Sequence, residues 1–245
     1  MTLPAHVSGL KDGGKLAGSV AQRLQMMIAA KGFPVGQVIG TEPGLMLELG
    51  VSRAVFREAV RLLEQDEVAQ MRRGPGGGLV VTAPRASSVA RAAALYLQFF
   101  GAGADDIFEA RTALELQTAD LAAQRIDEKG IDLLRAALEE EAELQDESGH
   151  LGSSRIHLVI AELTGNPALR LFVEVLALLT PGITPADPTV AAARQADVRH
   201  VHGRIVDAIV AGDSSVARHR MLRHLQGIGY YLQEIERRPA PREPE

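Results

Sequence analysis

The sequence predicts a mainly α-helical protein of two domains, and three observations support that fold class. Apolar residues recur at helical spacing along most of the 245 residues. Two short β-forming runs flank the glycine-rich segment "RRGPGGG", which is the pattern of a hairpin. Beyond residue 91 the helical spacing continues to about residue 236 with few strand signals. We therefore expect a small helical domain that carries one hairpin, followed by an all-helical domain.

The first domain, residues 16–82, follows the element order of a winged helix-turn-helix. "LAGSVAQRLQMMIAAKG" predicts a helix with the core stripe Leu16, Val20, Leu24, Met27 and Ile28. "FPVGQVIGTEPG" is rich in turn residues, and "LMLELG" predicts a short helix that ends at a glycine. Ser52 is a suitable N-cap for the next helix, with Val51 and Phe56 at the two staple positions. "VAQM" and "LVVT" then predict the two strands of a β-hairpin wing.

The rest of the chain divides into tails, a linker and a helical domain. Loose tails are predicted at residues 1–15 and 237–245, a linker at 83–91, and the second domain at 92–236. Glycine, asparagine and proline at 165–167 mark a helix boundary within that domain. The apolar spacing predicts helices at about 87–100, 105–125, 129–146, 151–164, 167–179, 188–211 and 213–236.

Composition narrows the functional classes. The absence of cysteine excludes disulfides, thiolate metal sites and a cysteine nucleophile. No apolar stretch is long enough for a signal peptide or a membrane span, so we expect a cytoplasmic protein without a membrane partner. Residues 1–85 carry 10 Lys and Arg against 7 Asp and Glu, whereas residues 86–245 carry 16 against 24. The basic front favours a polyanionic partner, although ordinary variation of surface charge also explains so small a difference.

Arginines at helical spacing follow the Ser52 cap. Arg53 and Arg57 lie one turn apart on one face of the predicted helix, away from its apolar side. Arg53 occupies the first helical position, where the helix dipole disfavours a cation, so local helix stability does not explain it. The second helix of a helix-turn-helix enters the major groove, where arginine pairs with guanine edges or phosphates. Arg72 and Arg73 of the wing would lie beside the same duplex. The alternative is a solvated cationic face followed by a loose turn.

The stretch "LELGVSRAVFREAVRLLEQDEVAQMRRGPGGGLVV" resembles the DNA-binding domain of GntR-family bacterial transcription regulators, in particular the FadR-like branch. The resemblance covers the whole first domain and places Ser52, Arg53 and Arg57 in register with the family pattern. It implies that both arginines contact double-stranded DNA, assisted by Ser52, Arg73 and Gly74.

One departure from that family concerns the preceding helix. Many members have a DNA-contacting arginine directly after a glutamate, but here Pro43 follows Glu42, so that contact is missing. Such regulators are most often repressors. We therefore expect a homodimeric repressor that binds a near-palindromic operator, because a two-fold dimer requires a two-fold target.

Three histidines stand beside apolar stripes on separate predicted helices: His157, His202 and His224. They converge only if those stripes pack into one interior. A single histidine in such a place is usually a hydrogen-bonded core residue, whereas three together, at positions that match ligands of the FadR-like family, favour a site. Neutral imidazoles in a mostly buried cavity are good ligands for zinc or nickel. Three further histidines are expected at the surface, without a role in this site: His6, His200 and His219.

The second domain resembles the FCD domain, the all-helical effector domain of the same FadR-like branch, over about residues 88–235. The matching segments are "FEARTALELQTADLAAQR", "IHLVIAELTGNPAL" and "HGRIVDAIVAGDSSVARHRMLRHL". The resemblance implies an antiparallel helical bundle whose cavity holds a small organic acid and often a divalent metal on one aspartate and three histidines. It also implies that Arg111 points into that cavity, where its guanidinium suits an effector carboxylate. The alternative for Arg111 is a surface ion pair with Glu115 or Glu109.

The match fails at the acidic metal ligand. Ser153 stands four residues before His157, where the family has the aspartate, and a serine hydroxyl is a poor ligand for these metals. In one arrangement the three histidines hold a Zn or Ni ion, completed by an effector carboxylate or water. In the other, they bind the effector directly, together with Ser153 and Arg111. His150 is a further candidate for the same cavity.

The leading hypothesis is a transcription regulator, not an enzyme, whose operator binding is modulated by a small organic acid in the helical domain. Two alternatives remain. A DNA-binding module that dimerises through its helical half without a ligand would show the same patterns. A metal-dependent hydrolase would need an open metal position and a carboxylate base, for which Glu162 lies on the wrong part of its helix.

Overall fold

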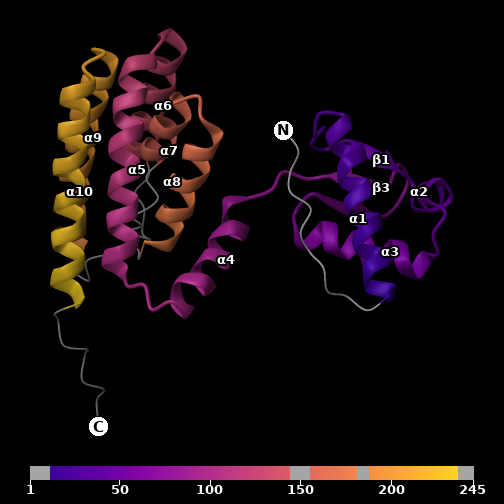
Figure 1. The fold of residues 1–245 in the computed structure, drawn as a ribbon. Coiled ribbons are helices and arrows are strands. Elements are labelled where there is room, and N and C mark those ends of the chain that lie inside the picture. The colour runs from indigo at the N-terminus through magenta and orange to yellow at the C-terminus, as the bar shows by residue number, and fades with distance from the viewer. Residues whose placement is uncertain (1–11, 144–154, 181–187, 237–245) are drawn as a thin grey trace. The chain divides into compact units, whose positions relative to one another are not determined.

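The computed structural model of the chain describes residues 12–143, 155–180 and 188–236. It divides into two compact units, residues 1–88 and residues 89–245 (Figure 1). In the described residues the first unit combines helices with a small sheet, and the second is built of helices. The predicted fold class, a winged helix-turn-helix followed by an all-helical domain, is confirmed.

The first unit begins with α1 (Asp12–Ala30), which packs against α3 (Arg53–Gln65). Both helices contribute fully buried side chains to one hydrophobic core: Leu24, Ile28, Phe56 and Leu63. The predicted core stripe of α1 is wrong at Leu16, which is 50% exposed, because Ala17 takes the core position. Three helical turns of about 3.6 residues lead back from Ile28 to Ala17, whereas repeated steps of four residues drift around the helix to Leu16.

One antiparallel sheet completes this unit, with β1 (Val38–Gly40), β2 (Ala69–Arg72) and β3 (Gly78–Val81) in the order β1-β3-β2. The strands β2 and β3 are the predicted hairpin. The strand β1 lies where the sequence predicted only turns, because a strand of three residues is too short to show an alternating pattern. Gly78 permits the close approach of β1, since a Cβ there would lie 2.4 Å from the carbonyl oxygen of Gly40.

The second unit holds most of α4 (Ala86–Phe99) and all of α5 (Ala104–Arg125), α6 (Glu128–Glu143), α7 (Arg155–Leu163), α8 (Pro167–Leu179), α9 (Pro188–Val210) and α10 (Ser214–Glu236). The helix α5 is central, because it packs against α7, α8, α9 and α10. Figure 1 shows α5, α9 and α10 side by side. Together with α7, they form one continuous core that includes Ala119, Ile160, Ile205, Ile209 and Met221.

Helix boundaries in this unit follow the residues that favour them. Gly165 follows α7 with a positive φ of 64°, the Asn166 side chain accepts the N–H of Ala168 at 3.0 Å, and Pro167 begins α8. The helix α4 begins at Ala86, so residues 86–91 of the predicted linker are helical. Among the described residues, no helix combines the length and the apolar character that crossing a bilayer requires.

Candidate DNA-binding surface and histidine site

Caps fix the turn between α2 (Glu42–Leu49) and α3. Gly50 ends α2 with a left-handed φ of 67°, a conformation that glycine adopts without strain. The Ser52 hydroxyl accepts the N–H of Val55 at 3.4 Å, which is the predicted N-cap of α3. The helix α2 begins earlier than the sequence indicated, because the Thr41 hydroxyl caps it by accepting the N–H of Gly44 at 3.3 Å. The first turn of α3 therefore has a defined position relative to α2.

Arg53 and Arg57 project from the first turns of α3, and 65% of each side chain is exposed. Their Nε atoms lie 3.2 Å and 3.1 Å from the same carboxylate oxygen of Glu42. Sequence reasoning placed both arginines on one face but missed Glu42 as their shared partner. Exposed ion pairs contribute little to folding stability, so the consequence of this contact is the orientation of two cations.

The turn of the wing, between β2 and β3, has a defined backbone shape. Gly77 donates its N–H to the carbonyl oxygen of Gly74 at 2.9 Å, and the guanidinium of Arg72 donates to the carbonyl oxygen of Gly76 at 3.2 Å. A Cβ at Gly77 would lie 2.3 Å from the carbonyl oxygen of Arg72, so only glycine fits there. Arg73 is exposed in the same turn. Hydrogen bonding therefore closes the glycine run into a compact loop that carries two arginines.

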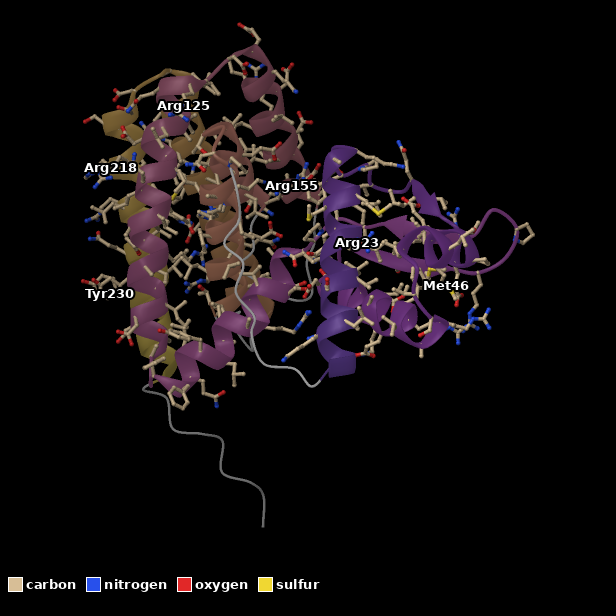
Figure 2. The ribbon with its side chains drawn as sticks, turned by 45° about the vertical axis from the view of Figure 1, so that its right-hand side comes forward. Arg23, Met46, Arg125, Arg155, Arg218 and Tyr230 are labelled. Atoms are coloured by element: carbon tan, nitrogen blue, oxygen red, sulfur yellow. The ribbon has the colours of Figure 1, made fainter. Side chains whose placement is uncertain are left out.

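Three histidines meet inside the second unit, namely His157 from α7, His202 from α9 and His224 from α10; they are 2%, 1% and 7% exposed. The Nε2 atom of His224 lies 3.1 Å from Nε2 of His202 and 3.2 Å from Nε2 of His157. The apolar stripes of the three helices thus pack into one interior, as the sequence analysis required. On the other side of α10, Arg218 and Tyr230 face outward (Figure 2).

Two carboxylates approach the far sides of the histidine rings. Both oxygens of Glu141 lie near Nδ1 of His202, at 2.8 Å and 2.9 Å. Glu115 contacts Nδ1 of His157 with one oxygen. Sequence reasoning missed both roles, although Glu141 falls one helical turn after the buried Ala137 on the inner stripe of α6. The spacing from Ala137 was the only sequence feature that could have placed Glu141 on the inner face. The neighbouring glutamates of α6 made Glu141 look like part of an exposed acidic segment.

Arg111 and Glu115 form an ion pair inside the second unit. Nε of Arg111 lies 2.5 Å from a Glu115 oxygen, and the two side chains are 0% and 1% exposed. The partner considered in the sequence analysis is correct, but the surface location is wrong, because four helices pack around α5. Within the described part of the chain, the terminal nitrogens of Arg111 are buried and have no hydrogen-bond partner. Such a buried donor is costly until an acceptor satisfies it.

Burial sets the protonation of this cluster. Desolvation and the neighbouring rings of His157 and His202 lower the pKa of His224 well below its usual value. Desolvation likewise lowers the pKa of His202 and outweighs the opposing effect of Glu141. Burial raises the pKa of Glu115, but His157 and Arg111 outweigh it, so that the net pKa is lowered. Burial therefore favours the neutral imidazole of His202 and of His224, and the ionised form of Glu115 is favoured beside them.

The nitrogen atoms of the three histidines have the spacing of metal ligands. Zinc–nitrogen bonds of about 2.0–2.1 Å at tetrahedral angles hold two nitrogens roughly 3.4 Å apart. The separations of 3.1 Å and 3.2 Å between Nε2 atoms are close to that value. Neutral imidazole is a good ligand for zinc and nickel. A cation between the three rings would be stabilised by their converging nitrogen lone pairs. The residues present therefore fit a divalent transition-metal ion.

The other histidine, serine and glutamate candidates from the sequence either lie away from this cluster or fall outside the described residues. Ser153, His150 and His6 lie outside the described residues. His200 and His219 are exposed, as predicted. The Glu162 carboxylate is 57% exposed and lies 3.7 Å from Arg170, so it does not serve the histidine cluster.

Comparison with known families assigns both units. Residues 16–80 match the family described as bacterial regulatory proteins, gntR family, and residues 106–227 match the FCD domain. An Escherichia coli (strain K12) protein, whose name links it to regulation of the L-lactate dehydrogenase operon, is 31% identical over 231 residues, covering 86% of this chain and 84% of its own. The Uxu operon regulator of Haemophilus influenzae is 27% identical over 222 residues, covering 88% of this chain and 81% of its own.

A solved structure shares the fold. Streptococcus agalactiae GntR superposes with a TM-score of 0.64 at 24% sequence identity, covering 88% of this chain and 99% of that one. At this identity the likeness concerns the fold, and it agrees with the order of a helix-turn-helix unit and a helical unit found here.

Proposed function

Because the chain belongs to the GntR family of bacterial regulatory proteins and carries an FCD domain, we propose that it represses transcription as a homodimer on a near-palindromic operator. It is a DNA-binding transcription regulator whose FCD domain binds an effector. Two winged domains related by a two-fold axis match two half-sites. The effector acts by binding the DNA-competent and DNA-incompetent arrangements with different affinity. Such a regulator works on the nucleoid, in the cytoplasm.

The DNA-binding surface of this proposal consists of the start of α3 and the turn of the wing: Ser52, Arg53, Arg57, Arg72, Arg73 and Gly74. The observation that carries it is the pair Arg53 and Arg57, held by Glu42 and 65% exposed at the capped N-terminus of α3. Arginine side chains there reach guanine edges or phosphates in the major groove. Proline at position 43 places no positive charge at the start of α2. We therefore expect Arg53 and Arg57 to make the DNA contacts on this side of the surface.

The effector of this proposal is a small organic acid that binds Arg111. A carboxylate accepts two parallel hydrogen bonds from one guanidinium group, and the terminal nitrogens of Arg111 are buried and unpaired within the described residues. The histidine cluster and Ser153 complete the effector site. The name of the Escherichia coli relative points to an operon of lactate metabolism, which makes 2-hydroxy acids a first class to test.

The histidine cluster of this proposal holds one zinc or nickel ion on His157, His202 and His224. When bound, such an ion would supply Lewis acidity for the carboxylate or hydroxyl oxygen of the effector. The imidazoles supply the ligands in their neutral form, which burial favours for His202 and His224. We assign no catalytic role to this site.

Selection of bound fragments from genomic DNA tests the regulator proposal. We expect a small set of near-palindromic sites, with binding altered by members of a panel of small carboxylates. Thermal-shift measurements against the same panel test the effector site separately. If specific sites are recovered but no carboxylate raises the melting temperature, the chain is a ligand-free dimeric DNA-binding module. Failure to bind any duplex at low ionic strength contradicts the regulator proposal itself.

A further inference from the structure

We propose that Glu115 and Glu141 are positioning residues of the histidine cluster. Each carboxylate accepts a hydrogen bond from Nδ1 of one histidine and thereby turns the Nε2 lone pair of that ring toward a shared metal ion. The inference builds on the metal site of the proposed function. Neither glutamate touches the metal in this arrangement.

Contacts at Nδ1 define the tautomer of two rings. An ionised carboxylate only accepts hydrogen bonds, so a ring nitrogen in contact with it carries the proton. Glu141 holds Nδ1 of His202 between oxygens at 2.8 Å and 2.9 Å, and Glu115 contacts Nδ1 of His157. In a neutral imidazole the proton on Nδ1 leaves the lone pair on Nε2. In its neutral form, each of these two rings is therefore held in the tautomer that binds metal through Nε2.

Glu115 is itself held from two sides. One oxygen contacts His157, and the other lies 2.5 Å from Nε of Arg111. The carboxylate therefore joins the arginine of the effector site to a histidine of the metal site. By comparison, His224 contacts the other two rings through Nε2 and has no such carboxylate among the described residues. Two rings are oriented by anions, and the third is oriented by packing.

Charge gives these carboxylates a second role. A site built on three neutral histidines brings no negative charge of its own. Glu141 adds an anion at one hydrogen bond from the ligands, whereas Arg111 offsets the charge of Glu115. Carboxylates behind ligating histidines raise the basicity of the ring and strengthen metal binding.

Matched glutamine variants test the inference. Glu115→Gln and Glu141→Gln keep the side-chain shape but remove the negative charge, and they replace one acceptor oxygen with an amide nitrogen that only donates. Zn²⁺ affinity is measured by competition with a chromophoric chelator. We expect each variant to bind Zn²⁺ about 10- to 100-fold more weakly than wild type. Glu109→Gln on α5 and Glu139→Gln on α6 alter exposed carboxylates of the same helices and should leave the affinity unchanged.

A second readout separates positioning from general stability. Nitrogen-15 NMR of the metal-free protein reports which ring nitrogen carries the proton. We expect His202 to be protonated on Nδ1 in wild type and to populate the Nε2–H form in Glu141→Gln. Glu141 is partly exposed, so this variant should fold even if Glu115→Gln, which leaves Arg111 without a carboxylate, does not.

Three outcomes are informative. Loss of Zn²⁺ affinity together with the tautomer change supports the inference. Affinity and tautomers equal to those of the controls overturn it. If wild type binds neither Zn²⁺ nor Ni²⁺, the proposed metal site fails, while the tautomers of the metal-free protein still decide whether the glutamates orient the rings.

A separate observation concerns α4, and we infer that its aromatic face packs against the same face of a second copy of the chain. Tyr96, Phe99 and Phe100 are 63%, 82% and 65% exposed, and Leu95 beside them is 71% exposed. The rings contact one another, with centroids 4.6 Å apart for Tyr96 and Phe100 and 5.2 Å apart for Phe99 and Phe100. The largest contiguous exposed apolar patch on a protein surface often marks an interaction site.

Area and charge both favour a second copy as the occupant. The exposed parts of the three rings amount to roughly 400 Å² per protomer, so two copies bury about half of a standard interface before neighbouring residues are added. The face formed by Leu95, Tyr96, Phe99 and Phe100 carries no charge, so an identical face meets it without repulsion. A helix of 14 residues is marginal on its own, and such packing stabilises it.

Molar mass in solution tests this interface, which rests on the proposed homodimer. Light scattering after gel filtration should give about twice 26.2 kDa for wild type and a shift toward 26.2 kDa for the double variant Tyr96→Ser, Phe99→Ser. Phe172→Ser on α8, where the side chain is 50% exposed, is the matched control and should remain dimeric. A double variant that stays dimeric overturns the interface but not the homodimer. A monomeric wild type overturns both.

Discussion

Glu42 shows how one side chain shapes the candidate recognition surface. It contacts Nε of Arg53 and of Arg57, which sets the two guanidinium groups beside each other at the start of α3. At an exposed site this pairing adds little folding free energy. Its effect is to restrict where the arginine side chains can point before DNA arrives, which reduces the entropy lost on binding.

Replacing Arg57 with alanine should weaken operator binding by about 1–3 kcal/mol if the arginine contacts a base. If Arg57 contacts only phosphate, the loss is equal for all sequences and the salt dependence becomes shallower. Fluorescence anisotropy with operator and unrelated duplexes at several salt concentrations distinguishes the two. Arg61→Ala is the control, because Arg61 is 60% exposed on the same helix but pairs with Glu58 at 2.7 Å. Equal losses for the two variants contradict the assignment.

Glu67 is a residue whose contribution to stability depends on pH. It has a left-handed φ of 55°, and its carboxylate accepts hydrogen bonds from Arg85, which lower its pKa to about 2. The depressed pKa stabilises the folded state fully above the usual glutamate pKa, and this contribution is lost as the pH falls from about 4.5 toward 2.

Carbon-13 NMR should therefore report a Glu67 carboxyl pKa near 2 in wild type, and a higher value in Arg85→Gln. The free energy of unfolding of Glu67→Gln should fall less than that of wild type over the same acidic range, because glutamine does not titrate. Identical pH profiles for the two proteins would show that Arg85 does not stabilise the ionised form.

At the scale of elements, a glycine in the wing and a glycine in α10 have opposite effects on stability. Gly77 lies in the turn of the wing, where a Cβ would approach the carbonyl oxygen of Arg72 to 2.3 Å. Gly227 lies within α10, and a Cβ there meets nothing within 4 Å. The first glycine is required by a close approach, whereas the second costs helix stability without a steric reason.

Alanine substitution at these two positions should therefore change stability in opposite directions. Gly77→Ala should distort the wing and lower DNA affinity, because the turn positions Arg72 and Arg73. Gly227→Ala should raise the stability of the helical unit by up to about 1 kcal/mol. Thermal unfolding measures the stability of both variants, and DNA titration measures their DNA affinity. A wing that accepts alanine with unchanged DNA affinity would remove the turn from the recognition surface.

At the scale of the whole molecule, the histidine cluster connects the inward faces of three helices. His157, His202 and His224 lie on α7, α9 and α10, so an ion bound to all three ties these helices together. Anything that binds only the folded state stabilises it by mass action. Occupancy of this site is therefore linked to the stability of the entire helical unit.

Zn²⁺ at about 100 times its dissociation constant should stabilise the wild-type helical unit by about 2.7 kcal/mol. Removal of metal with a chelator should reverse the rise in melting temperature. His157→Gln should lose the response, and His219→Gln should keep it, because His219 is exposed on α10. Differential scanning calorimetry measures the effect, and an equal response in His157→Gln would place the ion elsewhere.

The sequence by itself determined the features that depend on neighbours along the chain. Ser52 as a cap, the boundary at Gly165 and Asn166, the hairpin and the helical spacing all follow from local backbone chemistry. The same spacing placed three histidines on inward faces, because apolar stripes must pack together. These local rules predicted the fold class, and they made the convergence of the rings conditional on the packing of the three stripes into one interior.

Only the tertiary structure decided which charged groups became partners. Glu115 and Glu141 come from α5 and α6, far in sequence from the histidines that they contact, and helical spacing alone cannot choose between a surface and a core ion pair for Arg111. The strand β1 likewise exists because it pairs with β3 across the unit. Such contacts depend on packing between distant segments, and a pattern read along one segment does not contain that information.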